Sequence, residues 1–157
     1  MIHINSPISS GKSTIGSALA HVLPHTDLIE GDDHGAPEHL PREVQWAIAF
    51  ERIEQSIRDT QCQYLVVAYP IDESQFLRLN AACRHRSARL VVVTLAPPMK
   101  TALADRGVRK LTRWERERII EMYAQGYQSR SFTDVFIDTS RGTVNECVNK
   151  IRSELQT

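Results

Sequence analysis

The sequence predicts an α/β domain built on a mostly parallel sheet. Short apolar runs alternate with amphipathic stretches along the 157 residues, an order typical of strand–helix–strand units. Hydrophobic residues make up 41% and charged residues 24%, as in ordinary globular domains. Since no repeat, low-complexity tract or long linker divides the chain, we expect residues 1–157 to form a single domain with its own core.

Five apolar segments are predicted to be strands. The first, MIHIN, opens the chain, and the third and fourth, QYLVVA and RLVVVTL, are the most apolar. The expected strands are 1–5, a short segment ending at 28–29, 63–68, 89–95 and 134–137.

Five helices are expected between and after these strands. An Asp or Thr followed three positions later by Gln or Glu is the signature of a helix start, and Pro24 and Gly126 mark two helix ends. The capping pairs are Asp72/Gln75, Thr112/Glu115 and Thr143/Glu146. The expected helices are about 12–23, 41 or 42–59, 72–84, 112–125 and 143–155. In the second helix the apolar residues at helical spacing are Val44, Ala47, Phe50, Ile53 and Ile57.

Charge and composition exclude several classes of protein. Nineteen basic and nineteen acidic residues give zero net charge, which argues against a dedicated nucleic-acid binder. No apolar run approaches the roughly 20 residues that span a bilayer, and no secretory signal is visible. Cys62, Cys83 and Cys147 are an odd number without a C-x-x-C pair, so we expect three buried thiols rather than a disulfide or zinc site. The sequence therefore favours a cytoplasmic monomer or homodimer with no nucleic-acid or membrane partner.

Residues 6–14, SPISSGKST, carry the most specific signal and are called the phosphate loop here. They resemble the pattern G-x-x-x-x-G-K-[ST], with Ser6 in place of the first glycine. Serine tolerates a left-handed backbone less well than glycine, so this exchange bears on the loop geometry. Backbone N–H groups and the helix N-terminus would hold phosphates, Lys12 would reach the β- and γ-phosphates, and Ser13 would bind Mg²⁺. The expected nucleotide-binding residues of the loop are Ser9, Ser10, Gly11, Lys12, Ser13 and Thr14. The alternative is a Ser/Gly turn with a solvated lysine.

Two charged segments point to the same chemistry. The acidic loop, residues 30–43, carries five acids and one base after the second strand, at the sheet edge where ligands bind. Its carboxylates would hold Mg²⁺ through water and accept a proton from a hydroxyl, or form a solvated loop without function. Residues 105–118 carry six bases and three acids. Arg106 and Arg109 flank Gly107 there, as in a basic lid that closes over phosphates, whereas an exposed helix face explains Arg113 and Arg116.

Together these features resemble the small P-loop kinases of metabolites, most closely shikimate kinase and gluconate kinase of the nucleoside-monophosphate-kinase-like branch. The resemblance implies a three-layer P-loop NTPase fold with a short basic lid at about 105–113, and ATP and Mg²⁺ as cofactors. Glu30-Gly31-Asp32 is similar to the family's D-x-D element. By that likeness Asp32 is the base or orienting carboxylate, Glu30 and Asp32 lie near the metal, and Asp33 is able to take over either role.

The resemblance also assigns the lid and the C-terminal loop. Residues 106–111, RGVRKL, look like the family's R…R-x-L lid pattern, so Arg109, with Arg106, would reach the phosphates. The loop after the last strand lies against adenine in that family, which makes Thr139 and Arg141, together with Ser140 and Gly142, candidates for base contacts. An ordinary turn is an equally good interpretation of that loop.

The departures concern the acceptor. Residues 69–72, YPID, stand where shikimate kinase has a glycine-rich turn. Shikimate kinase also has a substrate-binding arginine before a tyrosine of the lid helix. Here Ile119 stands at that position, four residues before Tyr123, and Arg118 is one step further away. Shikimate is therefore not the expected acceptor. The expected substrate-binding residues are Asp32, Asp33, His34, Arg42 and Tyr69. Trp46 and Phe50 are interpreted as core rather than as an acceptor wall.

The sequence therefore predicts a kinase that moves the γ-phosphoryl group of ATP to a hydroxyl of a small polar metabolite or an antibiotic. Lys12, Asp32 and Arg109 are the expected catalytic residues. Three alternatives remain open: a nucleoside or nucleotide kinase, a nucleotide-binding module without phosphotransfer, and a P-loop ATPase of a larger assembly.

Overall fold

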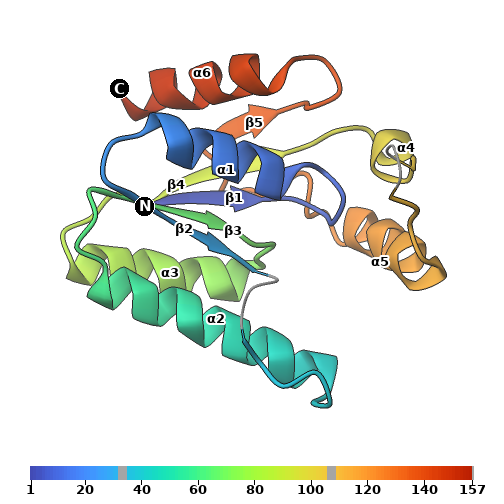
Figure 1. Ribbon diagram of the computed structural model, residues 1–157, viewed down its shortest axis with the longest axis horizontal. Helices are drawn as coiled ribbons and strands as arrows, with labels where there is room; N and C mark the ends of the chain where they lie inside the picture. Colours follow the sequence, from blue (N-terminus) through green and yellow to red (C-terminus); the bar gives the residue numbers. More distant parts are fainter. Residues whose placement is uncertain (32–34, 106–108, 157) are drawn as a thin grey trace.

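Five parallel strands form one sheet in the order β2-β3-β1-β4-β5 (Figure 1). The computed structural model describes residues 1–31, 35–105 and 109–156. The strands are β1 (Ile2–Asn5), β2 (Thr26–Glu30), β3 (Tyr64–Ala68), β4 (Val91–Leu95) and β5 (Val135–Ile137). Every pairing in this sheet is parallel, which confirms the predicted α/β class.

Helices cover both faces of the sheet and produce three layers. They are α1 (Lys12–Val22), α2 (Arg42–Asp59), α3 (Glu73–His85), α4 (Met99–Ala102), α5 (Arg113–Ala124) and α6 (Val144–Leu155). Figure 1 shows α1 and α6 on one face, α2 and α3 on the other, and α4 and α5 beyond the carboxyl ends of the strands. The sequence did not predict α4, because four residues are too few to show a helical period.

Local capping chemistry sets the helix starts as expected. All three predicted capping boxes are present, with side-chain oxygens of Asp72, Thr112 and Thr143 accepting from the backbone three residues on. Gly126 follows the end of α5 with φ 74°, a left-handed conformation that favours glycine. Each of these helix ends is therefore determined by residues within a few positions of it in the sequence.

The core has two halves, one on each face of the sheet. Alternate residues of each central strand point to opposite faces, so Val66 packs toward α1 and α6 while Leu65 and Val67 pack toward α2 and α3. Cys83 and Cys147 are buried in these halves as predicted, but Cys62 is only half-buried because it lies in the turn before β3. Among the described residues no helix is both long and apolar enough to cross a membrane.

The second helix departs from its predicted apolar face at its N-terminal end. Phe50, Ile53 and Ile57 are buried as expected, whereas Val44 and Ala47 are exposed. Figure 1 shows the reason, since the first turns of α2 project past the carboxyl edge of the sheet and have no strand beneath them. This end of α2 is consequently available to line a site.

His3 is a buried titratable group at the centre of the sheet. Its Nε2 donates to the carbonyl oxygen of Tyr69 at 2.7 Å, and its Nδ1 has no partner among the described residues. Burial lowers the pKa of His3 from 6.5 to about 4, and the charge of Lys12 adds to this, while the bond to Tyr69 opposes it. The ring is therefore neutral at neutral pH.

Acidification from pH 6.5 to about 4 should destabilise the fold through His3. The unfolded chain takes up a proton on this ring below pH 6.5, the folded chain only below about 4, so stability falls by roughly 3 kcal/mol as pH drops through this window. His3→Gln keeps a donor for the Tyr69 carbonyl but does not titrate. Urea unfolding of both proteins between neutral pH and pH 4 should show a flatter dependence in the variant, and equal slopes would contradict this account.

Candidate active site

The phosphate loop joins the central strand β1 to α1. Gly11 is the N-cap of α1 with φ 94°, and Ser9 also has a positive φ, of 62°. Ser6 is not among the residues with positive φ. Serine in place of the first glycine therefore imposes no left-handed strain, and the loop places its left-handed positions further along.

Lys12 folds back over the start of the loop. Its Nζ donates to the carbonyl oxygen of Pro7 at 2.8 Å and to that of Ser6 at 3.2 Å. The Oγ of Ser6 lies 3.3 Å from the same Nζ and itself donates to the Pro7 carbonyl at 2.9 Å. Ser6 thus gives the lysine an oxygen acceptor that glycine does not have.

A cavity of about 650 Å³ opens beside this loop. Five of the six loop residues predicted to bind nucleotide line it: Ser9, Gly11, Lys12, Ser13 and Thr14. Ser10 does not line it but is fully buried, and its Oγ has no partner among the described residues. The loop therefore presents its backbone and Lys12 to one continuous space.

The predicted adenine loop lies partly against the phosphate loop. Thr139 donates from Oγ1 to the carbonyl oxygen of Ser10 at 3.3 Å. Arg141 is exposed and pairs with Asp138 at 3.1 Å. Neither Thr139 nor Arg141 lines the cavity, so a nucleotide base contact for them stays a prediction.

The acidic loop begins at the carboxyl end of β2. Glu30 is the last residue of that strand and lies beside Ala68 of β3. The predicted residues Asp32, Asp33 and His34 lie outside the described residues. Gly31, directly before these residues, lines the cavity and donates from its backbone N–H to the Ala68 carbonyl at 3.0 Å.

Tyr69 and Gly31 fit together at this edge. The Tyr69 ring lies so close to Gly31 that a Cβ there would overlap Cδ2 of the ring. Tyr69 also lines the cavity, and its carbonyl is the one held by His3. The glycine of the predicted Glu30-Gly31-Asp32 element is therefore needed for space, since its φ is not among the positive ones.

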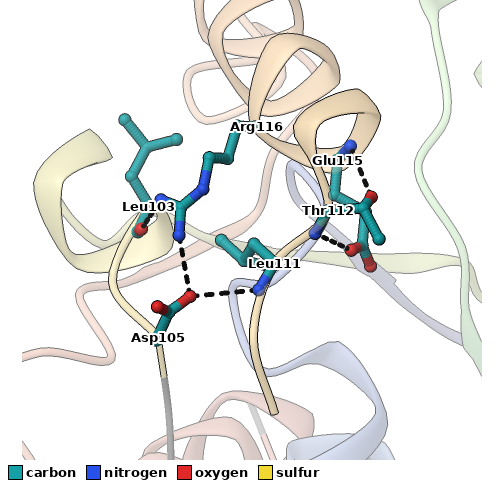
Figure 2. A network of polar contacts seen from close by, with 6 residues as sticks. All are labelled: Leu103, Asp105, Leu111, Thr112, Glu115 and Arg116. Carbon is teal, nitrogen blue, oxygen red and sulfur yellow. Dashed lines mark hydrogen bonds and ion pairs between the residues drawn. The ribbon is translucent and has the colours of Figure 1, made fainter.

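Asp105 fixes the two ends of the predicted lid, of which Arg106 lies outside the described residues. Figure 2 shows its Oδ1 accepting from the Leu111 backbone N–H at 3.0 Å and from Arg116 at 2.8 Å. Arg116 also donates to the Leu103 carbonyl at 2.9 Å. These bonds hold Asp105 and Leu111, on either side of Arg109, to each other and to α5.

Arg109 lines the cavity from this lid and pairs with Glu115. Its Nη2 lies 2.9 Å from Glu115 Oε1, and its side chain is 70% exposed. The Thr112 backbone N–H, and after it the Arg109 guanidinium, hold the pKa of the Glu115 carboxyl below its usual value. Glu115 is thus ionised and serves both the cap of α5 and the lid arginine.

A buried amide links the base of the site to three separate segments. Asn5, the last residue of β1, donates from Nδ2 to the Tyr127 carbonyl at 3.0 Å and to Thr94 at 3.3 Å. Its Oδ1 accepts from the Ile71 backbone N–H at 3.0 Å. Sequence reasoning missed this residue, although an asparagine in an otherwise apolar strand is a signal for such a role.

The wall opposite the phosphate loop is aromatic. Trp46 from α2 and Trp114 from α5 both line the cavity, as does Arg118. Of the two aromatics interpreted as core, Phe50 is buried as expected, whereas Trp46 lies on the part of α2 that projects past the sheet. Arg42 does not line the cavity but stacks on Trp114.

Solved structures share this fold over almost the whole chain. A gluconokinase from Sinorhizobium meliloti 1021 matches with a TM-score of 0.75 and 18% identity, over 99% of this chain and 90% of that chain. A shikimate kinase from Aquifex aeolicus matches with 0.63 and 16%, over 99% and 95%. The Mycobacterium tuberculosis APS kinase CysC, solved with AMPPNP and APS, matches with 0.69 and 15%, over 99% and 96%.

This chain has the P-loop kinase fold. The sequence matches no family model, and no curated protein matches it significantly. Identities this low establish the fold and leave the substrate open. The predicted three-layer fold is confirmed.

Trp114, Arg118 and Gln75 are among the lining residues that the sequence reasoning did not predict. Trp114 lies in the first turn of a charged helix, Arg118 stands one step from the expected register, and Gln75 is predicted only as a helix cap. A lone tryptophan in the first turn of a charged helix is the signal that would have identified the first of them.

Gly31→Ala should destabilise the protein, because the new methyl group and the Tyr69 ring cannot occupy the same space. Overpacking of this kind costs on the order of 1–3 kcal/mol. Chemical denaturation of Gly31→Ala, Tyr69→Ala and the double variant would measure the coupling. In the Tyr69→Ala background the Gly31→Ala exchange should cost much less, and strictly additive effects would contradict the close contact.

Proposed function

We propose that this protein transfers the γ-phosphoryl group of ATP to a hydroxyl group of a small polar molecule, a metabolite or an antibiotic. The observation that carries this proposal is that one cavity contains the phosphate loop, the lid arginine Arg109 and an aromatic wall. A nucleotide and an acceptor bound in that cavity would meet at the loop. The P-loop kinase fold, which in one matching structure holds AMPPNP, supports it.

At the nucleotide end the chain offers cations and backbone donors. The N-terminus of α1 begins at Lys12, so its free N–H groups and helix dipole favour phosphate oxygens. The Lys12 ammonium would exchange its Ser6 and Pro7 acceptors for β- and γ-phosphate oxygens. Arg109 would exchange Glu115 for the same phosphates as charge develops during transfer.

The available oxygen ligands fit Mg²⁺ that is held mainly by phosphates and water. Ser13 lines the cavity directly after Lys12, and Glu30 ends the neighbouring edge strand. Within the described residues no group of three His, Cys, Asp or Glu forms a metal cage. Mg²⁺ normally takes one or two protein oxygens together with phosphates, and its contribution is to neutralise phosphate charge. Ser13, Glu30 and Asp32 are the residues that would hold it.

At the acceptor end we assign the base to Asp32, which follows Gly31 directly in the chain. The acceptor oxygen would form a bond to the γ-phosphorus while the bond between that phosphorus and the β–γ bridging oxygen breaks. The acceptor proton would pass to the Asp32 carboxylate, and ADP would leave. Arg42 and Tyr69 would contribute to the acceptor side, and Asp33 and His34 stay candidates there. Most of the catalytic effect would come from positioning and charge stabilisation.

Lys12→Ala should abolish most transfer while the protein stays folded, because the lysine contributes charge to the phosphates and little to the core. ADP release with Mg·ATP, measured against sugar acids, polyols, nucleosides and aminoglycosides, is the assay. Lys150→Ala, on α6 away from the cavity, is the matched control and should retain activity. Asp32→Asn should also lose acceptor-dependent release. Undiminished turnover by Lys12→Ala would refute the site, and ATP binding with background hydrolysis alone would favour a nucleotide-binding module.

Ser6→Gly and Ser6→Ala should both tighten nucleotide binding. Each removes the hydroxyl that Lys12 must leave when phosphates arrive, and a long hydrogen bond of this kind is worth roughly 1 kcal/mol, or about fivefold in affinity. Calorimetric titration with Mg·ADP measures the change. Ser6→Ala keeps a Cβ and separates the hydroxyl from backbone effects. Weaker binding by Ser6→Ala than by the natural chain would show that the hydroxyl positions Lys12 rather than competing with phosphate.

A further inference from the structure

Both tryptophans of the chain line the same cavity and both are open to solvent. Trp46 is 38% exposed and Trp114 is 42% exposed. Phe50, one turn further along α2 than Trp46, is 3% exposed, so burial was available to an aromatic ring on this helix. Two indoles left open in one cavity are a surface that a ligand is able to cover.

Each indole already carries a planar group from the opposite helix. The Cζ of Arg42 on α2 lies 3.6 Å from the ring centroid of Trp114 on α5, and the Cζ of Arg118 on α5 lies 5.3 Å from that of Trp46 on α2. On each helix the arginine and the tryptophan are four positions apart and share a face. A guanidinium is flat, conjugated and weakly hydrated. Both indoles thus already have a flat conjugated group over the ring, in close contact at Trp114 and further away at Trp46.

The two indoles share a cavity with residues of the phosphate loop. The cavity that Trp46, Trp114 and Arg118 line also contains Lys12 and Ser13. Its volume of about 650 Å³ suits a molecule of drug size. Tyr69 lies between the two ends, since its hydroxyl lies 3.5 Å from the Trp46 carbonyl oxygen and its ring packs on Gly31.

We propose that the acceptor is a hydroxyl-bearing compound with a planar conjugated ring, which stacks on Trp46 and Trp114 while its hydroxyl extends toward the phosphate loop. The inference rests on the proposed phosphotransfer and names the class of acceptor. A conjugated ring has the flat shape of the guanidinium groups now on the indoles and gains more contact area than they do. Sugar acids and polyols have no such ring. The ring belongs either to the base of a nucleoside or to an aromatic natural product.

Intrinsic fluorescence tests the subsite directly, because all tryptophan emission of this protein comes from these two residues. The probes are adenosine and cytidine for the nucleoside source, benzyl alcohol for the aromatic source, and sorbitol and gluconate as ringless compounds. Each is titrated with and without AMPPNP, so that a nucleoside cannot report from the ATP site. We expect a saturable change with at least one ring-bearing probe and none with the ringless ones, and the probe that binds identifies the source.

Matched variants establish whether the indoles themselves bind the probe. Trp46→Leu and Trp114→Leu should each raise its dissociation constant about tenfold in calorimetry, while Trp→Phe at either position should retain most of the affinity. Phe136→Leu shortens another exposed ring, 48% exposed on β5 outside the cavity, and should leave binding unchanged. Circular dichroism melting and AMPPNP binding check that each variant is folded.

The outcomes separate this inference from the proposed function. The ring subsite would be overturned if no ring-bearing probe changed the fluorescence at millimolar concentration, or if the leucine variants bound the probe as tightly as the natural chain. Acceptor-dependent ADP release from gluconate or sorbitol, with an acceptor KM unaffected by Trp46→Leu and Trp114→Leu, would overturn it while phosphotransfer stands. Ring binding that depends on the indoles, with no ADP released, would support the subsite and refute phosphotransfer.

Discussion

The buried side chain of Asn5 ties together segments that are far apart in the chain. Its amide uses both ends, bonding the backbone N–H of Ile71 after β3 and the carbonyl of Tyr127 after α5, as well as the Thr94 hydroxyl on β4. Asn5 is also the last residue before the phosphate loop. A buried amide that lost these partners would carry a desolvation cost of about 1–3 kcal/mol for each unsatisfied group. The position of the base of the site is therefore set by a buried amide whose oxygen and nitrogen are both hydrogen-bonded.

The contact between α2 and α5 at the cavity is of a different kind. α2 and α5 meet through two arginine–tryptophan contacts. Arg42 lies over Trp114 at an exposed position, whereas Arg118, near Trp46, is 19% exposed and also pairs with Glu121. Exposed cation–π contacts contribute only about 0.5–1 kcal/mol each. A ligand ring can take the place of the exposed Arg42 on Trp114 at small cost, whereas the hydrogen bonds of Asn5 are buried. Under the proposed function, the phosphate end of the cavity would be the more rigid and the acceptor end the more adaptable, which suits transfer between a fixed nucleotide and a particular acceptor.

Much of the fold could be predicted because its signals are local. The strands after residue 63 are short apolar runs, and the capping boxes at Asp72, Thr112 and Thr143 each span four residues. The phosphate loop was also found from adjacent residues. The stack of Arg42 on Trp114 could not be predicted, because it depends on where α2 and α5 lie relative to each other. The close contact of Gly31 with the Tyr69 ring likewise requires β2 and β3 to be neighbours, and the sequence alone does not show that pairing.

The predicted lid combines a firmly bonded base with a weakly held arginine. Asp105 accepts from the Leu111 backbone and from Arg116, which also donates to the Leu103 carbonyl, so two bonds to one carboxylate and one to a backbone carbonyl hold the base of the predicted lid (Figure 2). Arg109 is 70% exposed and, among the residues that the structure describes, pairs with Glu115, and such exposed pairs are worth about 0–1 kcal/mol. Glu115 keeps its capping bond to Thr112 if the arginine leaves, so α5 stays intact. Under the proposed function, Arg109 would move to a phosphate while the helix behind it remains in place.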